Sequence, residues 1–386
     1  MKPDERAQMD TRLIHAGEPQ PRHAGSVVMP VYQTSTYQYG GEGQYDDLRY
    51  LRLNNSPNHE VLHQKLAAIE SAEAALVTAS GMAAISTALL SLLRPGDHVL
   101  AQRTLYGGTH DLLTQMLSTW GVEHSFFDAD EDRGWADALR PNTRMVYVEA
   151  LTNPLLEVAD LQAVAKFARA HDLVSVIDAT FATPVLLRPA ELGFDLVLHS
   201  ATKYLNGHSD IVAGAICGRS SYVESIRKTL NLLGGTLDPH ACALLHRGLK
   251  TLGVRVRQQC ATALEVARAL HEHPKVNVVH YPGLPSHPGH ERAGTLLDGG
   301  YGAMMSFDLA GGTEAADRFV DALTLPVNAP SLGGPETLVT RPALTSHLGL
   351  DPEVRRGLGI GDGLIRMSVG LEDPRDLIDD LRRALQ

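Results

Sequence analysis

Lys203 is the residue of this chain whose type and position most clearly suggest chemistry. It lies in "LHSATKYLNGHSDIVAGAI", residues 198–216, where the apolar run "FDLVL" ends. An ammonium group is costly to bury beside a core strand, and burial lowers its pKa. A lysine amine in such a place is a potential nucleophile toward carbonyl groups. Ser200 and Thr202 add hydroxyl groups, which could bind a phosphate or only satisfy the backbone of a turn.

Three further polar clusters follow apolar runs. Ser80, Gly81 and Met82 come after "AALVTA" and open a helical pattern, so their N–H groups could receive a phosphate or form an ordinary N-cap. Asn153 lies just beyond "VYVEA". Asp178 ends "VSVI" and could either hold a cationic ring nitrogen or cap the next turn.

Taken together, these clusters indicate one cofactor. A helix-terminus phosphate site, a carboxylate and a reactive lysine are the three groups that pyridoxal 5′-phosphate (PLP) requires. The lysine binds the aldehyde carbon, the carboxylate meets the pyridinium nitrogen, and the phosphate needs a cradle. The sequence therefore predicts a PLP site.

The elements that must position these residues alternate between strand and helix. We expect strands at 74–80, 98–102, 144–150, 173–179 and 194–200, with helices at 59–70, 81–93 and 161–171 among them. This alternation predicts an α/β fold with a mostly parallel sheet covered on both faces. Ligands of such sheets bind at the carboxyl ends of the strands, which is where all four clusters lie.

Three segments are expected along the chain. Residues 1–55 have few periodic apolar runs and are predicted to form an extended arm without a core of its own. Residues 56–245 form the predicted PLP-binding domain, and residues 246–386 a smaller C-terminal α/β domain. The second half is expected to contain a long helical stretch at 243–273, a strand at 302–310 and a terminal helix at 373–386.

Composition narrows the function classes. The 386 residues carry a net charge of −11, which argues against a general nucleic-acid or anionic-membrane surface. No apolar run is long enough to span a bilayer, and the charged start "MKPDERAQMDTRLIH" does not resemble a secretory signal. The three cysteines form no CxxC pair, so they are expected to be core residues in a reducing, cytoplasmic compartment: Cys217, Cys242 and Cys260.

No metal site is expected. Three histidines occur in "HYPGLPSHPGH", residues 280–290, but the prolines and glycines there indicate a surface loop. No Cys, Asp or Glu completes a ligand set nearby in the sequence.

The chain resembles the Cys/Met-metabolism (trans-sulfuration) family of PLP-dependent enzymes along nearly its whole length. Besides the Lys203 segment, the blocks that carry the resemblance are "ASGMAAISTALLSLLRPGDHVL", "LYGGTHDLL", "TNPLLEVADL", "VIDATFATP", "YPGLPSHPGH", "SLGGPETL" and "LIRMSVGLED". The resemblance implies a type I, aspartate-aminotransferase-like fold: a seven-stranded, mostly parallel sheet flanked by helices, plus a smaller C-terminal α/β domain.

The resemblance also implies residue roles. Lys203 would bind PLP covalently, Asp178 would meet the pyridine nitrogen, and Tyr106 would stack on the ring and act on the leaving group. The phosphate contacts would come from Gly81, Met82, Ser200 and Thr202. Arg366 would grip the substrate α-carboxylate as a bidentate fork, with further substrate contacts from Asn153, Ser331 and Tyr50.

The arm is implied to serve a neighbouring subunit. "YLRLNNSP" resembles the family segment in which a tyrosine and an arginine reach the phosphate of another chain, places that Tyr50 and Arg52 take here. Leu51 departs from the small residue that is usual between them. We therefore expect a homodimer or homotetramer with shared active sites.

The expected reaction is α,γ-elimination on a sulfur amino acid, as in methionine and cystathionine γ-lyases. γ-Replacement on an O-activated homoserine, as in cystathionine γ-synthases, uses the same residues and stays open. Pro330 replaces the glutamate common in cystathionine enzymes, Gly108 the cysteine of many methionine γ-lyases, and Ala179 the usual asparagine.

Two readings from other classes also stay open. A nicotinamide-dependent dehydrogenase would share the parallel sheet, but no G-x-G-x-x-G follows a first strand. A catalytically inactive scaffold on the same fold conflicts with the presence of Lys203, Asp178 and Arg366 together.

Overall fold

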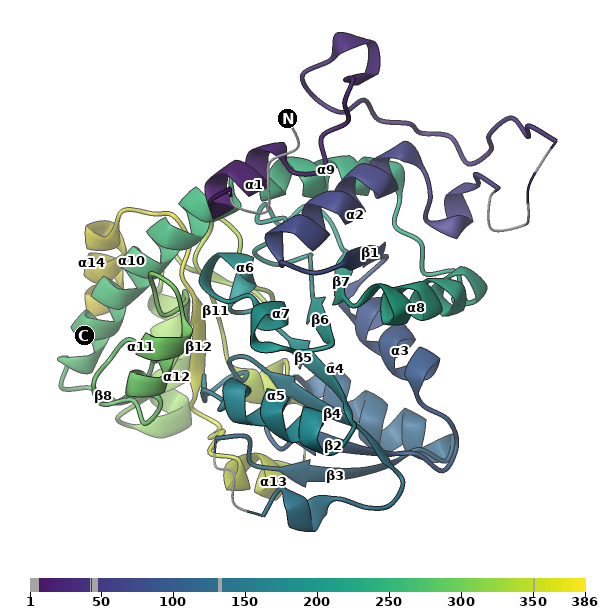
Figure 1. The fold of residues 1–386 in the computed structure, drawn as a ribbon. Helices are drawn as coiled ribbons and strands as arrows, with labels where there is room; N and C mark the ends of the chain where they lie inside the picture. The colour runs from purple at the N-terminus through teal and green to yellow at the C-terminus, as the bar shows by residue number, and fades with distance from the viewer. Residues whose placement is uncertain (1–6, 42, 44–47, 131–133, 350) are drawn as a thin grey trace.

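Two β-sheets, each covered by helices, lie side by side in the structure (Figure 1). The structure is a computed structural model that describes residues 7–41, 43, 48–130, 134–349 and 351–386. The larger sheet has seven strands and the smaller sheet has five.

The larger sheet confirms the predicted architecture. Its spatial order is β1-β7-β6-β5-β4-β2-β3. Only β7 runs antiparallel to its neighbours β1 and β6, so the sheet is mostly parallel. Its strands are β1 (Ala74–Thr78), β2 (His98–Gln102), β3 (Glu123–Phe127), β4 (Thr143–Glu149), β5 (Val174–Asp178), β6 (Leu196–His199) and β7 (Gly214–Gly218).

The sequences of the central strands are continuous apolar runs because both faces of these strands are buried. Val146 and Val148 of β4 join the core cluster on one face, whereas Met145 and Tyr147 join the cluster on the other. This is the period-two alternation of a strand between two helical layers. The helices around the sheet are α2 (Pro57–Ile69), α3 (Gly81–Leu92), α4 (Gly107–Asp111), α5 (Leu161–Ala170), α6 (Thr183–Leu186), α7 (Pro189–Leu192) and α8 (Ser220–Leu233).

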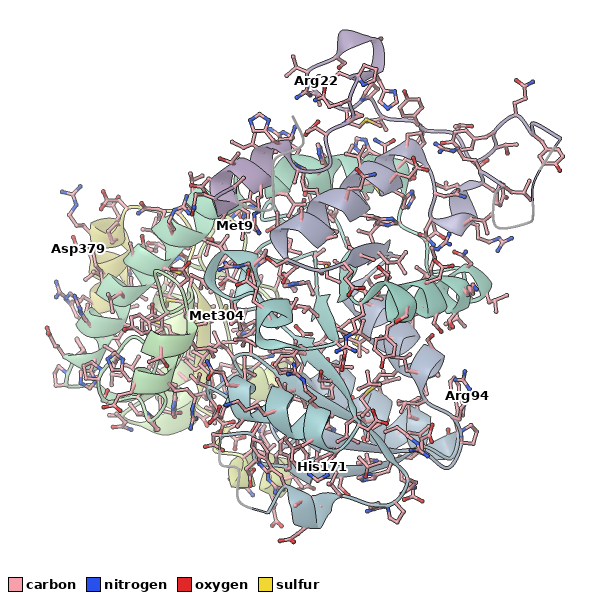
Figure 2. The ribbon with its side chains drawn as sticks, viewed as in Figure 1. Met9, Arg22, Arg94, His171, Met304 and Asp379 are labelled. Carbon is pink, nitrogen blue, oxygen red and sulfur yellow. The ribbon has the colours of Figure 1, made fainter. Side chains whose placement is uncertain are left out.

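The smaller sheet has the order β10-β11-β12-β9-β8. Its strands are β8 (Val276–His280), β9 (Met304–Leu309), β10 (Val327–Asn328), β11 (Leu338–Thr340) and β12 (Ile365–Ser368). The helices of this half are α10 (Leu252–His271), α11 (His290–Leu296), α12 (Gly312–Ala322), α13 (Pro352–Gly357) and α14 (Pro374–Ala384). Met304 lies inside the molecule, whereas Arg94 and Asp379 lie exposed at its edges (Figure 2). His171 is also exposed.

The helical stretch expected at 243–273 is two helices. α9 (Pro239–Leu249) ends before α10 begins, because the chain tightens at Lys250 and Thr251. Their N–H groups donate to the carbonyls three residues back, at 3.2 and 3.1 Å, instead of continuing the α-helical ladder. Shorter helical turns cover His23–Gly25, Leu51–Leu53, Leu112–Leu117, Ala136–Ala138 and Pro342–Leu344.

The N-terminal segment is not extended throughout. It contains α1 (Met9–His15), whose Leu13 is buried in the main core. The buried Lys65 of α2 donates from Nζ to the carbonyl oxygens of Leu13 at 2.9 Å and Ile14 at 3.2 Å, near the end of that helix. Between α1 and α2 the chain leaves the body of the molecule as a long projecting loop (Figure 1).

The remaining expectations have mixed outcomes. All three cysteines are buried, as predicted. The segment 280–290 is not simply a surface loop, because Tyr281, Leu284 and His287 are buried. Within the described residues, no group of three His, Cys, Asp or Glu could hold a metal ion, and no helix has the length and apolar character needed to cross a membrane.

Candidate active site

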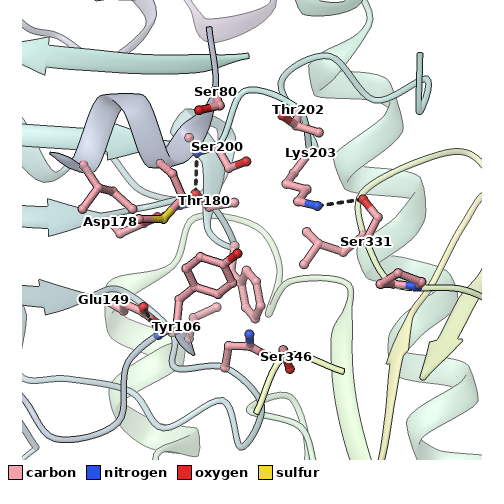
Figure 3. A pocket seen from close by; sticks show the side chains of 18 of the residues that line it. Ser80, Tyr106, Glu149, Asp178, Thr180, Ser200, Thr202, Lys203, Ser331 and Ser346 are labelled. Atoms are coloured by element: carbon pink, nitrogen blue, oxygen red, sulfur yellow. Dashed lines mark hydrogen bonds between the residues drawn. The ribbon is translucent and has the colours of Figure 1, made fainter. Parts of the chain in front are cut away.

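A cavity of about 670 Å³ opens at the carboxyl ends of the parallel strands (Figure 3). Arg366 of the smaller sheet and loop residues 330–332 and 345–346 line its other side. The cavity brings together ten of the residues predicted from the sequence: Gly81, Met82, Tyr106, Asn153, Asp178, Ser200, Thr202, Lys203, Ser331 and Arg366. These residues span most of the chain, so only the tertiary fold gathers them.

Lys203 lies in the turn that follows β6, and its side chain points into the cavity. Its Nζ donates to the hydroxyl oxygen of Ser331 at 2.7 Å (Figure 3). Burial, together with the positive charge of Arg366, lowers the pKa of Lys203 to about 8. No carboxylate of the described residues lies within 4 Å to hold the amine charged. The amine is therefore closer to its neutral, nucleophilic form than an ordinary lysine.

The start of α3 forms one end of the cavity. Ser80 caps this helix, its Oγ accepting from the N–H of Ala83 at 3.0 Å. A Cβ added at Gly81 would lie 2.8 Å from Cβ of Ser200, so only glycine lets the helix start approach the turn after β6. The first N–H groups of a helix have no intrahelical acceptor and attract anions.

The hydroxyl of Thr202 makes the backbone contacts that the sequence left as an alternative. It donates to the carbonyl of Ala213 at 3.1 Å and accepts from the N–H of the same residue at 2.9 Å. This pair of bonds fixes the turn that carries Lys203.

Two carboxyl groups lie next to each other at the ends of adjacent strands. Glu149 of β4 is in register with Asp178 of β5, so their side chains leave the same face of the sheet. Burial raises the pKa of Asp178, although hydrogen bonds from Thr180 oppose this. Burial and the negative charge of Asp178 raise the pKa of Glu149 well above its usual range.

Thr180 links the Asp178 carboxylate to the turn after β6. Its N–H donates to Oδ1 of Asp178 at 2.9 Å, and its hydroxyl oxygen accepts from the N–H of Ser200 at 2.8 Å (Figure 3). Neither Glu149 nor Thr180 was predicted from the sequence. The rule that polar residues at strand ends meet at one sheet edge could have found Glu149, which ends "RMVYVE".

Arg366 presents a buried guanidinium on β12 and is only 6% exposed. It donates to Oδ1 of Asn153 and to the carbonyl of Ser331, both at 3.1 Å. Burial lowers its pKa to about 10. Among the residues with described positions, no carboxylate lies within 4 Å of it. A buried cation with neutral partners is a ready receptor for a carboxylate ligand.

Tyr106 stands at the start of α4 with its side chain 40% exposed to the cavity and solvent. Its backbone N–H donates to Oε1 of Glu149 at 2.6 Å. A Cβ at Gly108 would lie 2.7 Å from the Tyr106 ring, so the glycine leaves room for the ring where it stands. The other departure, Ala179, is buried in the core.

Tyr50 and Arg52 do not line the cavity of their own chain. Arg52 donates from Nη1 to the carbonyl of Asn231 at 2.8 Å, at the end of α8, and its guanidinium lies 5.8 Å from the centre of the Tyr50 ring. The structure thus leaves these two residues on the outside of the chain that carries them.

Known proteins resemble this chain in both sequence and fold. The family model of the Cys/Met metabolism PLP-dependent enzymes matches residues 10–386. The chain belongs to this family. It is 43% identical to L-methionine gamma-lyase of Pseudomonas putida, over 97% of this chain and 96% of the relative, and 42% identical to cystathionine gamma-lyase of Bacillus subtilis, over 97% and 98%.

A solved structure gives the same fold. Cystathionine gamma-lyase from Lactobacillus plantarum, complexed with L-serine, superposes with a TM-score of 0.93 at 37% identity, covering 98% of both chains. This family member is therefore a PLP-dependent enzyme, and the α/β fold predicted from the sequence is confirmed.

The residues that line the cavity fit PLP independently of the comparison with these proteins. The capped start of α3 supplies backbone donors for a phosphate. Asp178 supplies a carboxylate for a ring nitrogen, and the Lys203 amine has no acidic partner within 4 Å in the described chain. These are the three requirements of the cofactor.

Proposed function

We propose that this enzyme is a C–S lyase that cleaves a sulfur amino acid by α,γ-elimination. With methionine and water, the products would be 2-oxobutanoate, ammonia and methanethiol. Relatives named methionine and cystathionine gamma-lyase, similar over nearly the whole chain, support this reaction class.

The family resemblance and the contacts described above support the following catalytic roles. Bound PLP supplies an electron sink for the bond broken at Cα. Lys203 holds the cofactor, then takes the proton from Cα and moves another from Cβ as a general base. Tyr106 stacks on the ring of the cofactor and gives a proton to the departing sulfur.

The other residues bind and orient. Arg366, positioned by Asn153 and Ser331, fixes the substrate carboxylate so that the Cα proton faces the lysine. Gly81 and Met82 offer their N–H groups to the phosphate, with the hydroxyl of Ser200. The hydroxyl of Thr202 can join them only by giving up its bond to the carbonyl of Ala213. Asp178 meets the ring nitrogen.

The charged residues that line the cavity are the observation on which we base the preferred substrate. Among the described residues that line it, the only cations are Lys203 and Arg366, and the only acids are Glu149 and Asp178. Arg366 suffices for one α-carboxylate. Cystathionine brings a second ammonium and a second carboxylate, and the described lining offers no further pair for them. A substrate with one amino-acid end and an uncharged thioether, as in methionine, fits best.

γ-Replacement is the second candidate, because the same proton transfers precede it. A product screen separates the two. The purified holoenzyme is given L-methionine, L-cystathionine, or O-succinyl-L-homoserine with L-cysteine, and the 2-oxo acid, ammonia and thioether products are measured.

We expect 2-oxobutanoate from methionine, with a kcat/KM above that for cystathionine, and none from the Lys203→Ala control. Formation of cystathionine from the activated homoserine, without release of 2-oxobutanoate from methionine, would show that the enzyme is a synthase.

A further inference from the structure

Glu149 lies in the active site without a role in the steps proposed above. Its side chain is buried, and the residue is 5% exposed at the end of β4. It lines the cavity beside Asp178. A buried carboxyl group needs hydrogen-bond partners to offset its desolvation, and its partners indicate what it does.

The carboxyl group holds the backbone of the segment that carries Tyr106. Oε1 of Glu149 accepts from the N–H of Tyr106 at 2.6 Å (Figure 3). The N–H of Glu149 itself donates to Oε1 of Gln102 at 2.8 Å, which fixes the strand end from the neighbouring strand β2. This series of hydrogen bonds runs from Gln102 of β2 through the end of β4 to Tyr106, the residue just before α4.

The ring depends on this anchor for its position. Tyr106 is the residue just before α4, and a Cβ at Gly107 would lie 2.4 Å from the carbonyl oxygen of Ser346. The segment is therefore held between Glu149 on one side and the 345–346 loop on the other. Loss of either contact would let the Tyr106 backbone, and with it the ring, shift.

Electrostatics indicate that this anchor is a neutral acceptor. Burial and the adjacent Asp178 raise the pKa of Glu149 well above its usual range, although hydrogen bonds from the backbone N–H groups of Tyr106 and Asn153 oppose this. No lysine or arginine of the described residues lies within 4 Å of either carboxyl group. Two carboxylates side by side cannot both ionise cheaply, and one of them keeps a proton.

We propose that Glu149 is a positioning residue, a neutral carboxyl group that fixes the Tyr106 backbone and thereby holds the Tyr106 ring against the cofactor. The inference rests on the role proposed above for Tyr106.

The test compares Glu149→Gln, which keeps the acceptor oxygen but cannot ionise, with Glu149→Ala, which removes the acceptor. Asp380→Ala is a matched control, because Asp380 also accepts from backbone N–H groups, those of Thr324 and Leu325, but does not line the cavity. The measurements are the PLP dissociation constant, the visible circular dichroism of bound PLP and the pH profile of kcat.

We expect Glu149→Ala to weaken PLP binding about tenfold and to change the dichroism band, since a displaced ring loses its stacking contact. Glu149→Gln should keep PLP affinity within about threefold of wild type, with an unchanged pH profile. Asp380→Ala should lower the melting temperature without changing the dichroism. A Gln variant that behaves like the Ala variant would overturn the proposal, because the charge would then matter rather than the acceptor.

A double-mutant cycle tests whether the effect passes through Tyr106. In the Tyr106→Ala background, Glu149→Ala should add little further loss of PLP affinity, because the ring that it positions is gone. Fully additive losses would overturn the proposal. If Tyr106→Ala alone leaves PLP affinity and dichroism unchanged, the role proposed for Tyr106 itself is wrong, and that failure is distinguishable from failure of the anchor.

Discussion

Two lysines, Lys65 buried and Lys203 half-buried, show how surroundings give one side chain different functions. Burial lowers the pKa of Lys65 to about 7 and that of Lys203 to about 8. Yet Nζ of Lys65 donates to backbone carbonyls at the end of α1, whereas Nζ of Lys203 faces the cavity and Ser331. A perturbed pKa alone therefore does not identify the catalytic lysine, and the difference lies in what each amine can reach.

This contrast leads to a labelling prediction. Borohydride reduction of the holoenzyme, followed by proteolysis and peptide mapping, should place the pyridoxyl label on the peptide with Lys203 and leave the Lys65 peptide unlabelled. The Lys203→Ala variant should carry no label above background. Label on Lys65 in the wild type would contradict the assignment.

Pro330 is the residue at which a substrate preference can be tested. It lines the cavity next to Ser331, whose carbonyl accepts from Arg366. Pro330→Glu should add an acceptor for the distal ammonium of cystathionine and raise kcat/KM for cystathionine relative to methionine about tenfold.

Pro330→Gln is the matched control, since it makes the same backbone change without the charge. It should leave the ratio of the two kcat/KM values close to that of wild type. An equal rise in both variants would attribute the effect to the loss of proline instead of the new carboxylate.

At the scale of elements, the phosphate end depends on how closely α3 approaches the turn after β6. Gly81 and Ser200 are 119 residues apart in sequence, yet they lie so close that a Cβ at Gly81 would overlap Ser200. The approach directs the free N–H groups of the helix start and the hydroxyl of Ser200 into one volume, which neither element could form alone.

Gly81→Ala should disrupt this contact. The new Cβ would lie 2.8 Å from Cβ of Ser200 and force the helix away. We expect PLP affinity to fall about tenfold or more, measured by dialysis and refilling. Gly294→Ala, on α11, is the control, because its Cβ would meet only the Tyr301 hydroxyl, at 3.5 Å. This variant should bind PLP like wild type. If both variants bound PLP with the same affinity, the result would contradict a role for the close packing of Gly81 against Ser200.

At the scale of the whole molecule, the two sheets each supply part of the site. Asp178 ends a strand of the larger sheet and Lys203 lies in the turn after another, whereas Arg366 lies on a strand of the smaller sheet. Tyr50 and Arg52, which lie between α1 and α2, do not line the cavity of their own chain. We therefore propose that these two residues complete the site of a second copy of the chain.

Mixing two inactive variants tests this arrangement. Lys203→Ala and Arg52→Ala chains are dissociated, combined in equal amounts and reassembled. Hybrid dimers should contain one intact site, so activity should return to about a quarter of the wild-type value. Each variant reassembled alone is the control and should stay inactive. Verified hybrids without activity would show that each chain completes its own site.

The sequence by itself determined the local structure and the edge of the sheet where the chemistry lies. Alternating apolar runs placed Asp178 and Lys203 at strand ends, and parallel strand ends share one edge. Local pattern was less reliable where long-range packing decides. It joined α9 and α10, missed α1, and treated residues 280–290 as surface, because burial of those segments depends on distant partners.

Only the tertiary structure decided which groups meet inside the cavity. Lys203 contacts a hydroxyl 128 residues away, and Arg366 an amide 213 residues away. Glu149 gained its place because β4 and β5 pair in register and the start of α4 folds back onto them. A pairing of this kind is set by packing across the whole chain, since no local propensity encodes the distance between residues that approach only after the sheets have formed.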